Sequence, residues 1–341
     1  MRSVTAILSA ASLVVVAALA PHTGEAQAPF ELNIGSLAPD NTPWRDMLVQ
    51  LEKHVEKGSN GQLNVILRPP GLMAEVEMVR ETRKGERLQG AGVTTAAIAE
   101  GGNVPQLQLV ELPFLFKSYE EADHLLDHVL FDEFSSVLNR RGFVLGMWSE
   151  NGWRGFGSKG KPIRKAEDLV GLKMRSQESA VHMAMWRAFG ANAVQKPTTE
   201  ILTSLQSNVI DGLDNTALYT LAGGLAEPLD YFTLSRHIYQ PAAVVFSRTW
   251  YSKLPEAFQK LLLEPKDLYT EPARKAIRAE DAQMISMFPD MGMEVVELTD
   301  AERAAFEAKG LAVHESFAAT VEGGPELLKK IKDALAAYRA K

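Results

Sequence analysis

Arg175 is the residue whose type and position best suit the binding of a small anion. It lies near the end of the run Leu172-Lys-Met-Arg-Ser176, in which apolar and polar side chains alternate as they do along a β-strand. A guanidinium is always charged, and its parallel N–H groups fit both oxygens of a carboxylate. An arginine at a strand end is more often a solvated or structural charge than a ligand contact. The neighbouring sequence is therefore needed to distinguish a ligand contact from a structural or solvated charge.

The sequence on both sides of Arg175 predicts that its side chain lines a crevice. Asp168 and Leu169 have the pattern of a short helical turn, and Gly171 gives the backbone the freedom to leave that turn. A helix is predicted over residues 179–189. Because side chains at the ends of strands in open α/β sheets line a crevice, we expect Arg175 to line one.

The order of the predicted elements indicates an α/β protein. The first elements alternate between strand and helix, at residues 30–34, 44–58, 63–67, 73–83 and 88–93. This order implies a parallel sheet with helices on its faces. Further strands are predicted at residues 143–148, 231–238, 242–246 and 294–298, and further helices at 131–138, 255–263, 265–288, 301–317 and 325–338. The apolar run 110–116 is expected to fill the core.

Two breaks in these patterns predict crossings between two lobes. The first break is near Asn151 and the second is at Gln240-Pro241. We expect the lobes to comprise the following residues: 29–151 and 241–280 in lobe I, and 152–240 and 281–341 in lobe II.

The composition is that of an ordinary soluble protein. The chain has 341 residues, of which 46% are hydrophobic and 23% are charged, which is enough for about two domains. A net charge of −7 argues against nucleic acid or an anionic membrane surface as the main partner. The sequence has no cysteine, which excludes disulfides, thiolate metal sites and the cysteine that lipidation requires.

Residues 1–28 are predicted to be a cleaved secretory signal. Met1-Arg2 gives a short positive start, an apolar run follows over residues 4–20, and Ala26-Gln-Ala28 provides small residues at the cleavage site. The alternative is a membrane anchor, for which the uncharged run is at the lower limit of length. We expect the mature chain to start near Pro29, in the periplasm.

The central stretch of the chain resembles the DctP-type solute-binding proteins of tripartite ATP-independent periplasmic (TRAP) transporters. The resemblance extends through most of the mature chain and is carried by the runs Trp148-Ser-Glu-Asn-Gly-Trp-Arg154, Glu167-Asp-Leu-Val-Gly-Leu-Lys-Met-Arg175, Phe189-Gly-Ala191 and Val209-Ile-Asp-Gly-Leu-Asp-Asn215. It implies a two-lobed periplasmic binding protein of type II-like fold. In such a fold, mixed sheets carry helices on both faces and a long helix spans both lobes.

The resemblance also implies the ligand-binding residues. The family holds a ligand carboxylate on the arginine that matches Arg175. A second arginine matches Arg154, and the family's asparagine matches Asn215, whose amide can donate to a carboxylate and accept from a hydroxyl. The full set of expected ligand-binding residues is Arg175, Arg154, Asn215, Tyr219, Trp153, Trp148, Gln177 and Asp214.

Three positions depart from the pattern of the family. Asp214 stands where glutamate is usual, and Thr216 replaces a frequent proline. Lys196 replaces an apolar residue, and we expect it to face solvent rather than the ligand. The loop after Asn215 is therefore expected to differ in shape from that of other members.

The sequence contains no convincing motif for an enzyme active site, a cofactor site or a metal site. The run Gly155-Phe-Gly-Ser-Lys-Gly160 satisfies G-x-G-x-x-G, but the residues after it leave no room for the crossover helix of a dinucleotide site. No serine-hydrolase elbow, zinc-protease helix or Walker loop is present. His124 and His128 have helical spacing but no third metal ligand near them. We predict no catalytic residue, no cofactor and no metal.

The sequence thus predicts a solute-binding protein that captures a small organic acid by closure of two lobes. The resemblance implies that a monomer then delivers the acid to the small and large membrane subunits of a TRAP transporter. Two alternatives stay open: a periplasmic enzyme that uses Glu150 or Glu178 as a base, and a ligand sensor that docks to a receptor. Two arginines permit a dicarboxylate, but a monocarboxylate fits equally well if Arg154 is bonded internally.

Overall fold

The computed structural model describes residues 30–341, so the predicted signal segment lies outside the described part of the chain. The strands are β1 (Phe30–Ser36), β2 (Leu63–Leu67), β3 (Gly90–Thr94), β4 (Phe143–Ser158), β5 (Lys173–Ser176), β6 (Asn192–Gln195), β7 (Gly212–Thr216), β8 (Tyr231–Ser247) and β9 (Glu294–Val296). The α-helices are α1 (Pro43–Gly58), α2 (Glu75–Lys84), α3 (Thr95–Gly102), α4 (Tyr119–His124), α5 (Phe131–Arg140), α6 (Ala180–Phe189), α7 (Ile201–Gln206), α8 (Ala217–Ala222), α9 (Arg248–Tyr251), α10 (Glu256–Leu261), α11 (Pro265–Met287), α12 (Asp300–Leu311), α13 (Val313–Ala318) and α14 (Gly324–Arg339). Shorter helical segments are η1 (Pro105–Glu111), η2 (Leu125–Val129), η3 (Ala166–Leu169), η4 (Thr198–Glu200) and η5 (Pro289–Met291).

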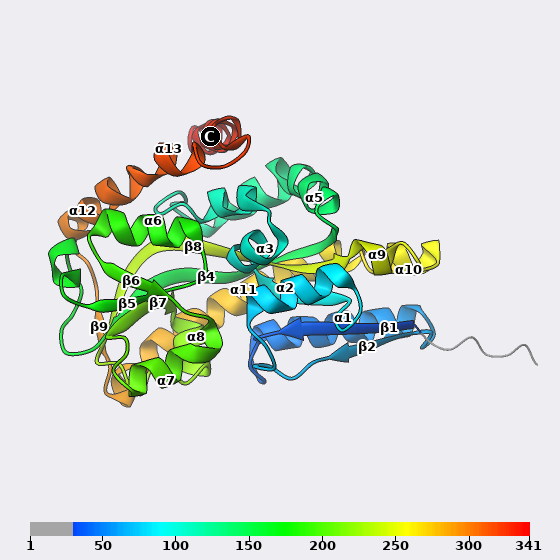
Figure 1. Cartoon of the computed structure of the whole chain (residues 1–341), viewed down its shortest axis with the longest axis horizontal. Helices are drawn as coiled ribbons and strands as arrows, with labels where there is room; N and C mark the ends of the chain where they lie inside the picture. Colours follow the sequence, from blue (N-terminus) through cyan, green and yellow to red (C-terminus); the bar gives the residue numbers. More distant parts are fainter. Residues whose placement is uncertain (1–29) are drawn as a thin grey trace, which may run out of the picture.

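These elements form one mixed sheet with helices on both faces (Figure 1). The strand order is β2-β1-β3-β8-β4-β7-β5-β6, and β9 pairs with β8. β1 lies parallel to β2 and β3, as the alternation of strand and helix predicted. β5 is likewise parallel to β6 and β7, whereas β8 is antiparallel to β3 and β4. The predicted α/β class is confirmed.

α1 shows how local sequence fixes an element beside the site. The Thr42 side chain accepts a hydrogen bond from the backbone N–H of Arg45, and Pro43 stands at the first helical position. The apolar positions of the helix, from Trp44 to Val55, recur at helical spacing and are buried. The β1–α1 turn is thereby held in place, and residues of this turn line the cavity described below.

β4 and β8 join the two ends of the sheet, and here the sequence-based expectation was wrong. They have 16 and 17 residues and pair antiparallel along most of their length, whereas the sequence predicted a strand only at 143–148 and two separate runs at 231–246. Pro241 remains inside β8 because its partner, Glu150, lies beside a bulge, where a residue without an N–H is tolerated. The Thr95 hydroxyl donates to the Pro241 carbonyl at 2.9 Å.

The predicted long helix is confirmed as α11, which has 23 residues and contacts β4, α1 and α8 (Figure 1). The helix predicted over 301–317 is instead divided into α12 and α13. The chain bends there around the loop of Pro113 and Phe114. A Cβ atom on Gly310 would lie 2.7 Å from the Phe114 ring, and the His314 ring donates to the Pro113 carbonyl at 2.8 Å.

The apolar cores lie on opposite faces of the sheet. Trp148 belongs to the largest cluster, together with α3, η1, α5 and α14, whereas Met147 belongs to a second cluster with α1 and α11. Because successive side chains of a strand point to opposite faces, β4 contributes to both clusters. The apolar run 110–116 does fill the core, since Val110, Leu112, Leu115 and Phe116 are buried in the first cluster.

A group of charged side chains ties α11 to β4. Arg278 of α11 donates to the Glu150 carboxylate at 2.7 and 2.9 Å and to Asp123 at 2.7 and 2.8 Å. The Tyr239 hydroxyl donates to the same Glu150 carboxylate at 2.6 Å. Burial raises the pKa of Glu150, although Arg278 and Tyr239 act in the opposite direction. The middle of the sheet is thus joined to the long helix through a buried carboxylate.

We predict that Arg278→Ala lowers the free energy of unfolding by about 3 kcal/mol, because it leaves the buried Glu150 carboxylate without its cation. Urea unfolding at pH 7 measures the loss. The double variant Glu150→Gln/Arg278→Ala is the control, and we expect it to regain part of the loss. Equal destabilisation by the single and double variants would contradict this role of Arg278.

Candidate ligand-binding site

A cavity of about 650 Å³, including its open mouth, lies between the β1-β3 end of the sheet and the β5-β7 end. One wall comes from the β1–α1 turn, the first residue of α2, and β3, and the opposite wall comes from β5, β7 and α8. Residues 149–151 and 154 of β4 and residues 242–243 of β8 lie between the two walls. The cavity is therefore lined from both predicted lobes.

Arg175 lies at the end of β5 and lines the cavity, as its position in the sequence predicted. Its side chain is 1% exposed, and its Nε donates to the Lys196 carbonyl at 2.9 Å. One Nη2 proton is shared weakly with the Thr198 hydroxyl at 3.4 Å. Within residues 30–341, no carboxylate forms an ion pair with this guanidinium. Burial, together with the nearby charge of Arg154, lowers the pKa of Arg175 to about 10.

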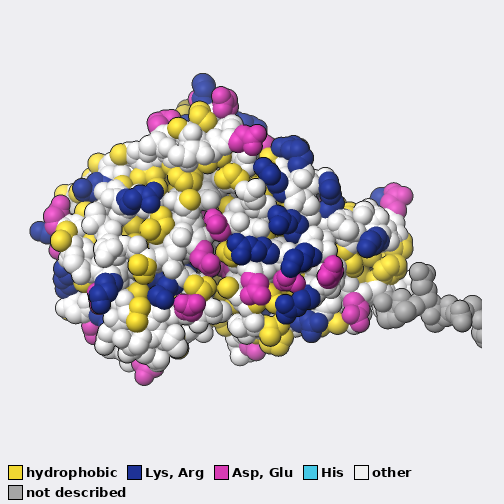
Figure 2. All heavy atoms as spheres, in the orientation of Figure 1, with side chains coloured by type: hydrophobic (Ala, Val, Ile, Leu, Met, Phe, Trp, Pro, Cys, Tyr) yellow, Lys and Arg dark blue, Asp and Glu magenta, His cyan; other side chains and the backbone are white. Residues whose placement is uncertain are grey.

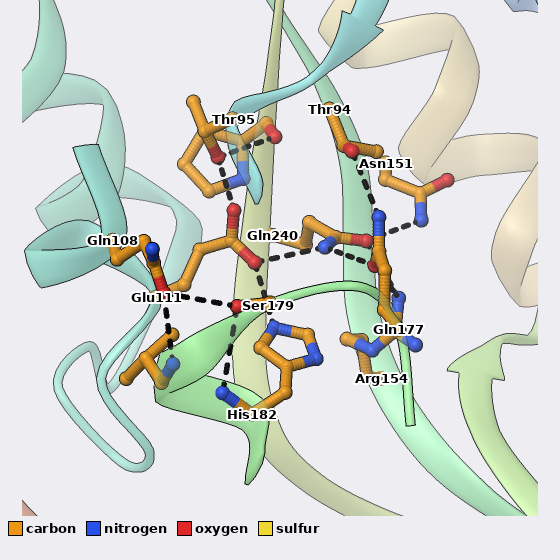
Figure 3. A network of polar contacts seen from close by, with 12 residues as sticks. Thr94, Thr95, Gln108, Glu111, Asn151, Arg154, Gln177, Ser179, His182 and Gln240 are labelled. Atoms are coloured by element: carbon orange, nitrogen blue, oxygen red, sulfur yellow. Dashed lines mark hydrogen bonds and ion pairs between the residues drawn. The ribbon is translucent and has the colours of Figure 1, made fainter. Parts of the chain in front are cut away.

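Arg154 of β4 also lines the cavity, but its donors are largely used within the protein (Figure 3). Its Nε donates to the Asp214 carboxylate at 2.6 Å, and its Nη2 donates to the Asp214 backbone carbonyl. Its Nη1 donates to the side-chain oxygens of Gln240 at 2.6 Å and Gln177 at 3.4 Å. Of the two arrangements left open by the sequence, the structure has the one in which Arg154 is bonded internally.

Asp214 holds Arg154 instead of lining the cavity. Its carboxylate is fully buried and lies 3.4 Å from Nε2 of His237 and 3.9 Å from Nδ1 of His182. Burial by itself would raise the pKa of Asp214, but Arg154 and His237 hold the pKa well below its usual value. Burial lowers the pKa of His237. Asp214 was expected to contact the ligand, but in the structure it binds Arg154 behind the cavity wall.

Asn215 and Tyr219 line the cavity from β7 and α8. The side-chain oxygen of Asn215 accepts from the backbone N–H of Thr216 at 2.9 Å, which directs its NH₂ group away from that bond. The Tyr219 ring lies 6.2 Å from the Trp44 ring on the opposite wall. Burial raises the pKa of Tyr219 to about 12, so its hydroxyl stays a neutral donor.

Gln177 follows β5 and connects the two walls. Its Nε2 donates to the Thr94 hydroxyl at 2.9 Å, and its Oε1 accepts from the Gln240 side chain at 2.8 Å. The network continues to Glu111, which accepts from Gln240 at 2.8 Å and lies 2.7 Å from the His182 ring (Figure 3). Of the eight expected residues, the structure brings Arg175, Arg154, Asn215, Tyr219 and Gln177 together around one cavity.

Trp148 and Trp153 lie away from the cavity. The Trp148 ring is in the apolar core, and its indole N–H donates to the Leu126 carbonyl at 3.2 Å. The Trp153 ring packs against the Tyr239 ring at a centroid distance of 5.5 Å. Trp148 differs from the expectation because it points to the opposite face of β4 from its neighbour Ser149, which does line the cavity.

Lys196 lies outside the cavity wall and forms an ion pair with Glu200 at 3.3 Å. Its backbone carbonyl, rather than its ammonium group, reaches the site, because that carbonyl accepts from Arg175. The Lys196 side chain is partly exposed, with 23% of its surface accessible.

Several polar or aromatic residues that line the cavity were not predicted from the sequence, among them Trp44, Glu75, Thr94 and Ser149. Trp44 was assigned to the apolar face of its helix, and its indole N–H donates to the Glu150 carbonyl at 2.8 Å. Glu75 stands at the first residue of α2, where an acidic side chain usually interacts with the helix dipole. Side chains alternate between the two faces of β4, so the sequence places Ser149 on the opposite face from Trp148.

The long helix positions the ligand-lining segment of α8. Asp281 of α11 accepts a hydrogen bond from the backbone N–H of Leu218 at 2.9 Å. The Thr216 side chain accepts from the N–H of Tyr219 at 3.2 Å, which satisfies another free donor of the same turn. Burial raises the pKa of Asp281 from 3.8 to about 6, although the backbone N–H of Leu218 acts in the opposite direction.

The remaining motifs of the sequence do not form sites. The G-x-G-x-x-G run begins in β4, whose neighbours β7 and β8 are antiparallel to it, so the match to a dinucleotide site was a coincidence.

Within residues 30–341, no group of three His, Cys, Asp or Glu side chains is arranged to hold a metal ion. None of the helices in that range is both long and apolar enough to cross a bilayer. On the face in Figure 2, Lys and Arg side chains gather in the region of α2 and α5, with Asp and Glu side chains among them.

A two-lobed α/β fold with a polar cavity between the lobes and a long helix beside them defines a class of solute-binding proteins. The sequence profile of DctP, described as bacterial extracellular solute-binding protein family 7, matches residues 34–320, and the chain belongs to this family. The family is one of binding proteins rather than of catalysts, and its named members include periplasmic proteins.

Known proteins of this kind resemble the chain over most of its length. It is 28% identical to the 2,3-diketo-L-gulonate-binding periplasmic protein of Escherichia coli, over 82% of this chain and 84% of that protein. It is 27% identical to the C4-dicarboxylate-binding periplasmic protein of Rhodobacter capsulatus, over 98% and 99% of the two chains. A TRAP periplasmic solute-binding protein from a Polaromonas species, solved with D-erythronate, superposes with a TM-score of 0.83 at 27% identity and covers 89% of this chain and 98% of its own.

We predict that Asp281→Asn changes how stability depends on pH. Because the folded-state pKa of Asp281, about 6, lies above the ordinary value of 3.8, folding favours the protonated carboxyl group. This group therefore lowers wild-type stability as the pH rises from about 4 to about 6, and the variant lacks that effect. Between pH 5 and pH 7, the unfolding free energy of the wild type should fall by about 1 kcal/mol relative to the variant. Parallel urea titrations would contradict the account if the difference were independent of pH.

Proposed function

We propose that this protein captures a small organic acid between its two lobes and delivers it to the membrane subunits of a TRAP transporter. The observation that carries the proposal is the guanidinium of Arg175, which is buried in the cavity wall with no carboxylate partner among the described residues. The relatives that bind 2,3-diketo-L-gulonate, C4-dicarboxylates and D-erythronate support an organic acid as the ligand.

The energetics of burial favour an anionic ligand at Arg175. Removing a charged group from water is costly unless it is paired and hydrogen-bonded. Two of the donor nitrogens bond to uncharged oxygens, while both protons of Nη1 and one of Nη2 remain for a ligand. A carboxylate placed against these protons would form the bidentate pair that a guanidinium prefers.

We further propose that the lobes close on the ligand by movement about the crossing strands. The bulge between Glu150 and Gly152 supports this, because it interrupts the pairing with β8 at the expected first crossing, and Gly152 has a positive φ of 112°. Lobe I would comprise residues 29–151 and 241–280, and lobe II would comprise 152–240 and 281–341. Closure is then favoured by contacts of the closed form, such as the bond between Gln177 and Thr94.

The proposed route places the protein in the periplasm as a monomer. Residues 1–28 would direct export and be removed, and the closed form would be presented to the small and the large membrane subunit. Membership of the family supports this route. Glu150, one of the two acids considered as a catalytic base, is held by Arg278 and Tyr239, which supports a structural role for it.

We predict that Arg175→Ala raises the dissociation constant for the carboxylate ligand by about 10- to 100-fold, the expected cost of losing a charge-assisted bidentate bond. Lys173→Ala is the matched control, since Lys173 lies on the same strand but is exposed and outside the cavity. Isothermal titration of both variants tests the anchor. An affinity of Arg175→Ala within about threefold of the wild type would remove Arg175 from this role.

A further inference from the structure

The cavity wall that faces Arg175 carries acceptors and hydroxyl groups rather than a second free cation. On the side of β1, α2 and β3, the polar lining residues are Ser36, Glu75 and Thr94, and β4 adds Ser149, Glu150 and Asn151. Among the described residues that line the cavity, the only cationic side chains are the two arginines. The donors of Arg154 are engaged by Asp214, Gln240 and Gln177. The site therefore offers one free guanidinium.

Ser149 is the polar group in this wall that most clearly lacks a partner. It is 3% exposed and lines the cavity, and no residue of the range 30–341 forms a hydrogen bond with its Oγ. A buried hydroxyl without a partner costs free energy, and native proteins seldom leave one unsatisfied. A hydroxyl both donates and accepts, so a hydroxyl, carbonyl or carboxylate group of a ligand can satisfy it.

Glu75 adds an acceptor to the same wall. Its carboxylate accepts from the backbone N–H of Thr94 at 3.0 Å, from the Thr94 hydroxyl at 3.3 Å and weakly from the Gln177 side chain at 3.4 Å. A carboxylate has about four acceptor positions, so further donors can bind it from the cavity. Burial raises the pKa of Glu75, although the hydrogen bonds from Thr94 and the charge of Arg175 act in the opposite direction.

The same carboxylate discriminates between ligands. A hydroxyl group of a ligand can donate to Glu75, whereas a second ligand carboxylate would meet a like charge. The apolar part of the cavity, from Trp44, Met47, Leu48 and Val93, suits the carbon skeleton of a short chain or ring.

We propose that the ligand is a polyhydroxylated monocarboxylate, a sugar acid, whose hydroxyl groups are bound by Ser149 and Glu75. This inference rests on the proposed function, because it takes Arg175 as the anchor of the single carboxylate. Glu75 and Ser149 then determine specificity: both bind hydroxyl groups of the ligand, and Glu75 also disfavours a second acid.

The test is a matched set of ligands that separates the number of carboxylates from the presence of hydroxyl groups. At four carbons the set is D-erythronate, butyrate, tartrate and succinate, and at six carbons it is D-gluconate, hexanoate, D-glucarate and adipate. Isothermal titration of the protein comprising residues 29–341 measures each dissociation constant. We expect the hydroxylated monocarboxylate of at least one length to bind at least tenfold more tightly than its three partners. Succinate, adipate, tartrate or glucarate binding as tightly would overturn the inference.

Three variants connect the preference to the residues. Ser149→Ala should weaken the binding of the hydroxylated monocarboxylate about tenfold without lowering the melting temperature of the free protein, because the hydroxyl has no partner there. Ser135→Ala is the control, because that hydroxyl is also buried without a partner among the described residues but lies on α5, outside the cavity. Glu75→Gln should reduce the preference for one carboxylate over two. Unchanged affinity and unchanged preference in both site variants would contradict the assignment.

The outcomes separate this inference from the proposed function. A dicarboxylate that binds tightly and is lost in Arg175→Ala would refute the sugar-acid assignment and leave the carboxylate anchor intact. A sugar acid that binds equally well to Arg175→Ala would refute the anchor, and with it the inference that rests on it.

Discussion

A buried guanidinium without a carboxylate partner is the constraint on which the rest of the site depends. Arg175 is removed from water at the end of β5, where Lys196 and Thr198 supply only uncharged oxygens. A second arginine stands near it, and the repulsion is moderated because Asp214 holds Arg154. In the absence of a ligand this arrangement is unfavourable, and a carboxylate relieves it. The unpaired charge of Arg175 in the free protein would therefore favour the binding of an anion.

β4, β8 and the long helix α11 hold the residues of the cavity walls in place around Arg175. β4 and β8 run continuously through the sheet, so the residues of the two cavity walls are fixed by one backbone framework. α11 is joined to β4 through Arg278 and Glu150 and to α8 through Asp281 and the N–H of Leu218. In the proposed mechanism, a movement between the lobes would displace the same few contacts that position the cavity-lining side chains, and closure would thereby be coupled to binding.

Much of the fold could be predicted from the sequence, because its signals are local. The spacing of apolar residues gave α1, α6 and α11, and the position of Arg175 at a strand end followed from alternation and turn residues. The continuity of β8 through Pro241 could not be predicted, because a bulge in a distant strand makes that proline acceptable. The internal bonding of Arg154 was likewise undecided, since Asp214 and Gln240 approach it only in the folded chain.

The site residues that belong to family motifs were predicted best. The residues that come together only in the folded chain were predicted least well. Five of the eight expected residues line the cavity, whereas Trp148 lies on the wrong face of β4 and its neighbour Ser149 on the right one. Alternation along a strand gives two faces but does not say which face carries the ligand. Glu75 and Trp44 come from a part of the chain in which no motif drew attention to them.

The most direct test of the central claim is a crystal structure of the protein with a bound hydroxylated monocarboxylate. The account predicts that both carboxylate oxygens lie roughly 3 Å from Nη1 and Nη2 of Arg175, with ligand hydroxyl groups at Ser149 and Glu75. A ligand whose carboxylate lies elsewhere in the cavity, with its hydroxyl groups or carbon chain against Arg175, would contradict it.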